Sequence, residues 1–276
     1  MSIFDEPKID CHAHIFDPTR FPYQENNPFH PGGGETGTVE QLGHVMRAYG
    51  VRHVLLVQPN SGYGTDNSYL LQAISESKGR FKGMAKIPHD ISLADLKSLK
   101  SRGVLGAAIN PTFDGLDYYR DAGGLIERLS ELEMIANIQV ENADLLMFMP
   151  WLREFPVRVV IDHCGRPAPG SNPDRPEYQA LRELAETQRS FVKISGFAKF
   201  STQGYPFDDI HPHLQSIMDI FTPQRCLWAS DWPFLRSPQR QDYGPLIKLM
   251  ETFFPDAADR RAVFWDNPRR LFGFGT

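Results

Sequence analysis

Short apolar runs alternate with amphipathic stretches along almost the whole chain. The runs are bounded by turn-forming residues, which predicts buried β-strands, and the stretches between them have the apolar spacing of helices. We expect strands at Ile9–Ile15, His53–Gln58, Gly83–Ile87, Gly106–Asn110, Ile135–Val140, Val157–Asp162, Phe191–Ser195 and Cys226–Ser230. We expect helices at Val39–Tyr49, Ser68–Ser77, Leu93–Ser101, Leu125–Leu132, Leu145–Glu154, Tyr178–Thr187, Pro212–Phe221 and Pro245–Phe253.

This alternation predicts a parallel sheet with helical connections, because parallel strands need a crossover between them. Eight β-α units in 276 residues match the usual size of one eight-stranded (β/α)8 TIM barrel, the α/β fold that we expect. No Ser/Gly-rich linker divides the chain, so a single domain over residues 1–276 is favoured over two smaller ones. The segment Asn267–Phe274 is expected to form a structural closing helix with an apolar plug.

Ionisable residues stand at the ends of three of the predicted strands. His12 and His14 are two residues apart in the first strand, so their side chains should point into the same space. His163 follows the sixth strand and Asp231 follows the eighth. Taken one by one, His163 could be a hydrogen-bonded core histidine and Asp231 a turn or cap residue. Three such strand ends in one chain instead predict a shared site that suits a divalent metal or a polarised carbonyl oxygen.

The composition is that of a soluble globular protein, and the charge limits the kinds of partner that the protein can bind. The net charge of −5 and the scattered positive charges argue against nucleic-acid binding. No apolar run is long enough to cross a membrane and the N-terminus lacks a signal-peptide core. The three cysteines, Cys11, Cys164 and Cys226, are predicted to be buried reduced thiols, so we expect a cytoplasmic protein. The oligomeric state is left open.

Long loops follow several predicted strands. In a TIM barrel these loops build the active site, and their length suits enclosure of a substrate. Within the first of them, residues 31–37 are glycine-rich and are interpreted as a mobile lid or a simple connector. The long loops are expected at Pro18–Thr38, Pro59–Asn67, Gly165–Pro176 and Gly196–Phe207.

With these features placed, the chain resembles the amidohydrolase superfamily, and within it the amidohydrolase-related branch of pyrone-dicarboxylate and sugar lactonases. The resemblance spans nearly the whole sequence. It rests on the segments Asp10–Phe16, Val57–Pro59, Gly64–Asn67, Ile161–Pro167, Ser230–Pro233 and Asn267–Phe272. It implies a hydrolase that opens a carboxylated or polyhydroxylated lactone in a catabolic pathway, with a small anionic lactone as partner. A decarboxylase or lactone isomerase on the same scaffold is the alternative, and a non-catalytic binding protein is disfavoured because the histidines and the aspartate are all present.

Two departures from the branch bear on the chemistry. The fifth strand ends without the histidine of many metal-dependent members, and the fourth ends at Asn110 without a bridging Lys or Glu, so no binuclear centre is expected. One Zn²⁺-like ion held by His12, His14, His163 and Asp231 is weighed equally against metal-free catalysis. The dicarboxylate lactonase of this branch has an arginine about where Ala108 stands in this chain. The absence of that arginine argues against a doubly charged pyrone as substrate.

The resemblance also assigns roles to residues at the predicted site. Asp231 is expected to be the general base that activates water, and the three histidines are expected to polarise the carbonyl, directly or through the metal. Arg166 can form a bidentate pair with a carboxylate, and Lys199 could hold the same or a second anionic group. The alternative interpretation of each residue is an ordinary surface charge. The loop residues that could contact substrate hydroxyls are Ser61, Tyr63 and Asn67, although loop polarity alone would also explain them.

Overall fold

Eight parallel strands follow one another in chain order around a single sheet. The computed structural model describes residues 2–168 and 174–275. The strands are β1 Lys8–Ala13, β2 Val51–Val57, β3 Phe81–Ala85, β4 Val104–Ile109, β5 Ile135–Ile138, β6 Arg158–Ile161, β7 Ser190–Ile194 and β8 Cys226–Trp228. Each pairs in parallel with the next, so every crossover leaves the carboxyl ends of all strands at the same edge.

The sheet closes on itself through the residues that follow β8. The amide of Asp231 donates to His12 O at 2.9 Å, and the amide of His14 donates to Trp232 O at 2.8 Å. A parallel bridge between Ala13 and Trp232 lies between these two bonds. The sheet is therefore a nearly closed (β/α)8 barrel, and the predicted TIM-barrel fold is confirmed.

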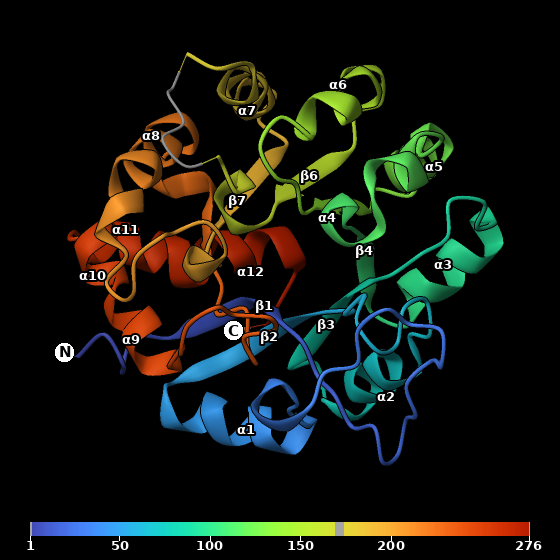
Figure 1. Cartoon of the computed structure of the whole chain (residues 1–276), viewed down its shortest axis with the longest axis horizontal. Helices are drawn as coiled ribbons and strands as arrows, with labels where there is room; N and C mark the ends of the chain where they lie inside the picture. The colour runs from blue at the N-terminus through green and yellow to red at the C-terminus, as the bar shows by residue number, and fades with distance from the viewer. Residues whose placement is uncertain (1, 169–173, 276) are drawn as a thin grey trace.

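Helices surround the barrel on its outer side (Figure 1). The main helices are α1 Val39–Ala48, α2 Ser68–Glu76, α3 Leu93–Ser101, α5 Gly123–Glu131, α6 Leu145–Glu154, α7 Pro176–Glu186, α8 His211–Phe221, α9 Tyr243–Lys248 and α10 Met250–Phe253. Shorter elements are α4 Pro111–Asp114, α11 Ala257–Arg261, the π-helical turn η7 Ala262–Asp266 and α12 Asn267–Phe272. The 3-10 turns are η1 Gly33–Glu35, η2 Leu116–Tyr119, η3 His163–Gly165, η4 Phe197–Lys199, η5 Asp208–Ile210 and η6 Pro223–Arg225. None of the helices in the described parts of the chain is long and apolar enough to cross a membrane.

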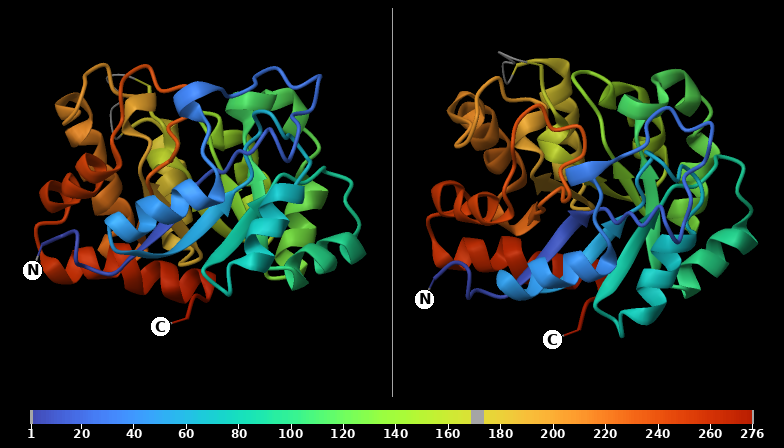
Figure 2. Two further views of the ribbon diagram at one scale, coloured as in Figure 1. Left: turned by 90° about the horizontal axis from the view of Figure 1, so that it is seen from below. Right: turned by 60° about the horizontal axis from the view of Figure 1, so that its bottom comes forward.

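Apolar side chains fill the barrel interior, and the C-terminal segment closes its lower end. Ile9, Ile135 and Phe191, near the starts of their strands, form one buried cluster with Trp265 of η7 and Phe274 beyond α12. Figure 2 shows α12, in red, lying across the end of the barrel opposite the long loops. The predicted closing helix with an apolar plug is therefore present.

The structure differs from the sequence-based boundaries in a few places. β1 ends at Ala13 rather than Ile15, and the amide of His14 that follows it donates to Trp232 O in the chain after β8. The predicted helix Pro245–Phe253 forms as α9 and α10, and α4 with η2 was not expected. In the predicted loop Gly165–Pro176, residues 169–173 lie outside the described residues.

The glycine-rich part of the first long loop is held against the chain that follows β8. Gly37 O accepts from the amide of Phe16 at 2.8 Å, and Arg236 N donates to Glu35 Oε1 at 2.5 Å. A Cβ at Gly37 would lie 2.1 Å from the ring of Trp232, so only glycine allows this approach. The loops after β1 and β8 thus pack together beside the open end of the barrel.

Candidate active site

Three histidines and one aspartate from distant parts of the sequence meet at the carboxyl end of the barrel. Oδ1 of Asp231 lies 3.7 Å from Nε2 of His12, 3.6 Å from Nε2 of His14 and 3.8 Å from Nε2 of His163. All four residues are buried. The structure brings together the four residues that the sequence analysis selected as catalytic.

Backbone turns at the strand ends aim these side chains inward. Asp231 (φ 62°) and His163 (φ 50°) both adopt the left-handed conformation that non-glycine residues rarely take. Such a conformation costs about 1–3 kcal/mol and persists where surrounding contacts impose it, often at functional sites. Gly196 makes room for His163, since a Cβ there would lie 2.6 Å from the imidazole ring.

Asp10 ties the two halves of the site together from below. Its Oδ1 accepts from the amides of His12 (3.1 Å) and Ser230 (2.9 Å). Its Oδ2 accepts from the hydroxyls of Ser230 (2.5 Å) and Tyr243 (2.7 Å). The buried carboxyl group therefore fixes the end of β1 against the residue that precedes Asp231.

The surroundings of Asp231 keep its carboxyl group ionised. Burial alone would raise the pKa of Asp231, but His163, His14, Lys199 and His12 outweigh burial and lower that pKa well below its usual value. The site therefore presents a carboxylate, an acceptor of protons and hydrogen bonds, at neutral pH.

Two of the histidines are held in the neutral form. Burial lowers the pKa of His12 to about 4 and the pKa of His163 to about 3. His163 Nδ1 lies 3.0 Å from Ser195 Oγ, and His14 Nδ1 lies 2.8 Å from Val57 O. Because a carbonyl oxygen only accepts, the hydrogen of neutral His14 is on Nδ1 and its Nε2 presents a lone pair to the site.

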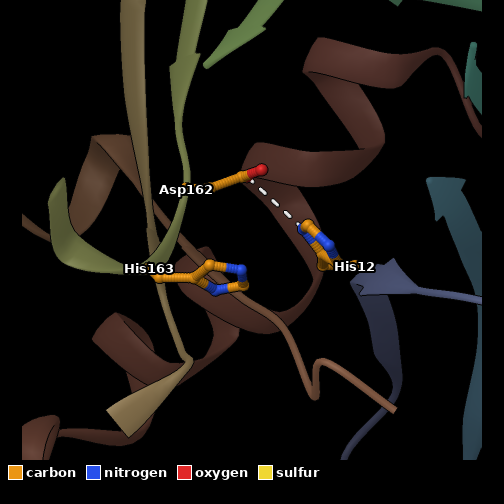
Figure 3. Close-up of side chains that lie close together, drawn as sticks. All are labelled: His12, Asp162 and His163. Carbon is orange, nitrogen blue, oxygen red and sulfur yellow. Dashed lines mark ion pairs between the residues drawn. The ribbon is translucent and has the colours of Figure 1, made fainter. Parts of the chain in front are cut away.

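A buried polar network that the sequence analysis missed lies directly beneath His12. Lys193 of β7 is completely enclosed, with Nζ 2.8 Å from Asp162 Oδ1, 2.7 Å from Asn137 Oδ1 and 3.1 Å from His12 Nδ1. Asn137 Nδ2 also donates to Asp162 Oδ2 at 2.6 Å. Figure 3 shows Asp162 and His163 leaving the end of β6 and facing His12 from β1. A lysine inside the apolar strand Ser190–Ile194 was the one signal for this network in the sequence.

The four residues line a cavity of about 360 Å³ at the open end of the barrel. Its volume suits a small ligand rather than a polymer. Besides the histidines and Asp231, its lining includes Gln58, Asn60, Ser61, Ala108, Asn110, Thr112, Asn137, Gln139, Glu141, Asp162, Arg166, Lys199 and Arg236. Polar side chains thus surround most of the space above Asp231.

Both predicted anion-binding cations line this cavity. Arg166 is mostly buried, and its Nη2 lies 2.6 Å from Glu141 Oε1 and its Nη1 3.4 Å from Thr112 Oγ1. Burial lowers the pKa of Arg166, and Nε of its guanidinium is buried without a hydrogen-bond partner among the described residues. Lys199 Nζ lies 3.9 Å from Asp231 Oδ2 and donates to Leu235 O; burial lowers its pKa as well.

The structure separates the three loop residues that were predicted to contact the substrate. Ser61 lies in the cavity wall. Tyr63 packs in an aromatic cluster with Phe16, and its hydroxyl accepts from the amide of Asp17 at 2.8 Å. Asn67 binds both backbone groups of Lys86, at 2.9 and 3.1 Å. Neither Tyr63 nor Asn67 is among the residues that line the cavity. They hold the loop after β2 in place instead.

The donor atoms at this site fit one divalent metal ion. His12, His14 and Asp231 offer ligand atoms within 4.8 Å of one another, and His12, Asp162 and His163 form a second such group. Nitrogen and carboxylate oxygen donors are the set that Zn²⁺ prefers at catalytic sites, and the bare Nε2 of His14 suits a ligand.

The cysteines are not suited to be metal ligands. Cys11 and Cys164 are buried, and burial raises the pKa of both thiols, that of Cys164 to about 12.

The barrel with a His/Asp centre at its carboxyl end defines a hydrolase-type TIM barrel, and the sequence comparisons specify the family. The family model described as Amidohydrolase matches residues 9–274. The chain belongs to this amidohydrolase family, as its motifs predicted. Members of the superfamily often bind a metal, in line with the ligand groups of this site.

Similar proteins cover almost the whole chain. The 4-sulfomuconolactone hydrolase of Hydrogenophaga intermedia is 30% identical over an alignment of 275 positions that covers 96% of this chain and 88% of that protein. The 2-pyrone-4,6-dicarboxylate hydrolase of Comamonas testosteroni is 28% identical over an alignment of 283 positions that covers 96% of this chain and 89% of that protein. A crystal structure of a probable 2-pyrone-4,6-dicarboxylic acid hydrolase from Acinetobacter baumannii, with citric acid bound, superposes with a TM-score of 0.80. It is 28% identical and covers 97% of this chain and 99% of its own.

Proposed function

We propose that this protein hydrolyses a small anionic lactone, with Asp231 as the general base. The observation that carries the proposal is the buried Asp231 carboxylate, within 3.8 Å of three histidine Nε2 atoms in a cavity that also holds Arg166 and Lys199. The named relatives are lactone hydrolases, so the prediction of a lactone-opening enzyme is confirmed at that level. Their activities favour lactone opening over the decarboxylase and isomerase alternatives.

The charges in the cavity favour a substrate with one strongly anionic group. Arg166 and Lys199 supply two buried cations, and Glu141 offsets part of the charge of Arg166. Ala108 lines the cavity where the resemblance to the dicarboxylate lactonase predicts an arginine. We therefore favour a lactone that carries one carboxylate or sulfonate. One of the relatives is named for a sulfonated lactone.

In the reaction, a water molecule near Asp231 loses a proton to the carboxylate as its oxygen attacks the lactone carbonyl. The new C–O bond produces a tetrahedral oxyanion, and the ring C–O bond then breaks to give the open acid. The proton on Asp231 passes to the departing ring oxygen. The strongly lowered pKa of Asp231 ensures the ionised form, although it also makes the carboxylate a weak base. Water attack therefore depends on stabilisation of the oxyanion by its neighbours.

Neighbouring donors supply that stabilisation. The Lys199 ammonium lies on the Oδ2 side of Asp231, at 3.9 Å, where it can also pair with the substrate anion. The three histidines lie on the Oδ1 side, at 3.6–3.8 Å; since Nε2 of neutral His14 carries no hydrogen, the N–H that points at the carbonyl oxygen belongs to His12 or His163. Arg166, on the wall formed after β6, is placed to orient the anionic group.

If a metal binds, His12, His14, His163 and Asp231 would hold it. A Zn²⁺-like ion there would supply a Lewis acid for the carbonyl oxygen and lower the pKa of bound water. Metal analysis of the purified protein, followed by activity measurements after chelation and after Zn²⁺ addition, decides whether an ion is required. If activity is lost when the metal is removed and recovers when Zn²⁺ is added, the reaction requires the ion. If the protein is fully active without bound metal, the reaction is metal-free.

A substrate panel tests the function. The purified protein would be incubated with 4-sulfomuconolactone, 2-pyrone-4,6-dicarboxylate and a neutral sugar lactone, and acid release would be followed by pH-stat titration. We expect an anionic lactone to give a higher kcat/KM than the neutral sugar lactone. No hydrolysis of any lactone above the rate of the Asp231→Asn variant would disprove the function, and CO₂ release would favour a decarboxylase.

A further inference from the structure

Lys193 and its three acceptors define a property of His12 that the proposed reaction does not by itself require. An ammonium group has three N–H donors and no acceptor. Its contacts are Asp162 Oδ1 at 2.8 Å, Asn137 Oδ1 at 2.7 Å and His12 Nδ1 at 3.1 Å. We infer that Lys193 donates a hydrogen bond to His12 Nδ1 and thereby fixes His12 as the tautomer with its hydrogen on Nε2.

Contacts on the other side of His12 lead to the same tautomer. His14 Nδ1 donates to Val57 O at 2.8 Å, so Nε2 of neutral His14 has no hydrogen. His12 Nε2 lies 3.2 Å from that bare nitrogen, a distance at which one of the two must donate. The donor is then His12. A continuous series of hydrogen bonds runs from Lys193 through His12 and His14 to Val57.

Asp162 is the competing partner for the same nitrogen. Its Oδ1 lies 3.4 Å from His12 Nδ1, the pair marked in Figure 3. If Nδ1 carried the hydrogen and donated to Asp162, the bond from Lys193 would be lost and Nε2 would be free to bind a metal. Lys193 and Asp162 thus favour opposite tautomers of His12. The shorter contact of His12 Nδ1 with Lys193, and the donor that His14 requires from His12 Nε2, favour the tautomer that Lys193 imposes.

Lys193 is therefore a positioning residue with a direct consequence for the site. It keeps the hydrogen of His12 on Nε2, where it donates to His14 in the free protein and can donate to a carbonyl oxygen once a substrate takes the place of that bond. It also opposes coordination of a metal through His12. Its positive charge acts in the same direction. This inference rests on the proposed function only in treating His12 as a residue of the site.

The tautomer can be measured without substrate or metal. In metal-free protein labelled with ¹⁵N-histidine, long-range ¹H–¹⁵N NMR distinguishes the protonated ring nitrogen from the bare one, and His12→Asn assigns the signal. We expect a protonated Nε2 and a bare Nδ1 for His12. A protonated Nδ1 in the wild-type protein would overturn the inference, even if every variant failed to fold.

Two lysine variants test the cause. Lys193→Met should move the hydrogen of His12 to Nδ1, toward Asp162, and should bind Zn²⁺ about tenfold more tightly in competition with a chromophoric chelator. Lys86→Met is the matched control, since Lys86 is also buried and pairs with Asp114 but has no contact with His12 among the described residues. An unchanged tautomer or an unchanged Zn²⁺ affinity in Lys193→Met would refute the role of Lys193. A protein with the expected tautomer that opens no lactone would refute only the proposed function.

Discussion

The pair formed by Arg166 and Glu141 gives a test of how the cavity selects an anion. Arg166 Nη2 lies 2.6 Å from Glu141 Oε1, and the two side chains are 14% and 39% exposed. The guanidinium is thus mostly desolvated while its carboxylate partner remains in contact with solvent. Nε of Arg166 is buried without a hydrogen-bond partner among the described residues, and the side chain lines the cavity, so the remaining N–H groups of its two Nη atoms are the donors for a substrate.

These contacts set the size of the expected effects. A hydrogen bond to a charged group contributes about 1.5–3 kcal/mol, which corresponds to roughly 10- to 150-fold in binding. Arg166→Met should therefore raise KM for an anionic lactone about tenfold or more. Glu141→Gln should lower KM for the same lactone by a smaller factor, about two- to fivefold, because the partly exposed carboxylate is screened by water.

Steady-state kinetics with two substrates separate binding of the anion from a general structural effect. KM and kcat would be measured for an anionic lactone and for an uncharged lactone with wild type, each variant and the double variant. We expect the neutral substrate to change less than twofold in KM in all variants. If both substrates respond alike to Arg166→Met, Arg166 is structural and the assignment is wrong. If Glu141→Gln weakens anion binding, Glu141 orients Arg166 instead of competing for it.

Three further predictions concern the base, the histidines and the stability of the fold. Asp231→Asn should lower kcat about a hundredfold or more with an unchanged melting temperature, because an amide cannot accept the proton; near-normal turnover would assign the base elsewhere. His12 is neutral above a pKa of about 4, so the acid limb of kcat/KM should lie near pH 4; a limb near 6.5 would contradict the burial of His12. Since this pKa lies below the ordinary 6.5, unfolded chains bind the proton first, and the free energy of unfolding should fall by up to about 3 kcal/mol between pH 6.5 and 4 in denaturant titrations. A free energy of unfolding that stays constant over this range would rule out a neutral buried His12.

Most of the fold could be predicted from the sequence because the periodic signal repeats. Each predicted strand and helix corresponds to an element of the structure, including the two-part helix at Tyr243–Phe253. The elements that were missed include α4 and the 3-10 turns, which are too short to show a helical period, and α11 with η7, which lead without a break into the predicted closing helix. The early end of β1 at Ala13 also could not be predicted, since the next amide, that of His14, bonds to Trp232 O in the chain after β8, a partner that is known only once the barrel closes.

The meeting of the three histidines with Asp231 could be predicted because these residues stand at strand ends, and a parallel barrel brings the ends of all its strands to one edge. His12, His163 and Asp231 needed only this topological rule. The loop assignments were less secure because a polar residue in a loop has many places to point. Tyr63 and Asn67 came from the same loop as Ser61, yet they bind backbone groups that hold the loop to its neighbours.

Lys193 and Asn137 belong to a different kind of position, one that sequence alone leaves ambiguous. A single polar residue within an apolar strand can face either the helices or the barrel interior, and its partners become known only when the barrel closes. In a TIM barrel each interior layer takes its side chains from alternate strands. His12, Asn137 and Lys193 come from β1, β5 and β7. The ammonium group of Lys193 lies within 3.1 Å of both His12 Nδ1 and Asn137 Oδ1. The layer rule, applied to isolated polar residues in odd-numbered strands, would have placed Lys193 under His12. By our inference, that buried cation then decides whether Nε2 of His12, the nitrogen that faces the site, carries the hydrogen.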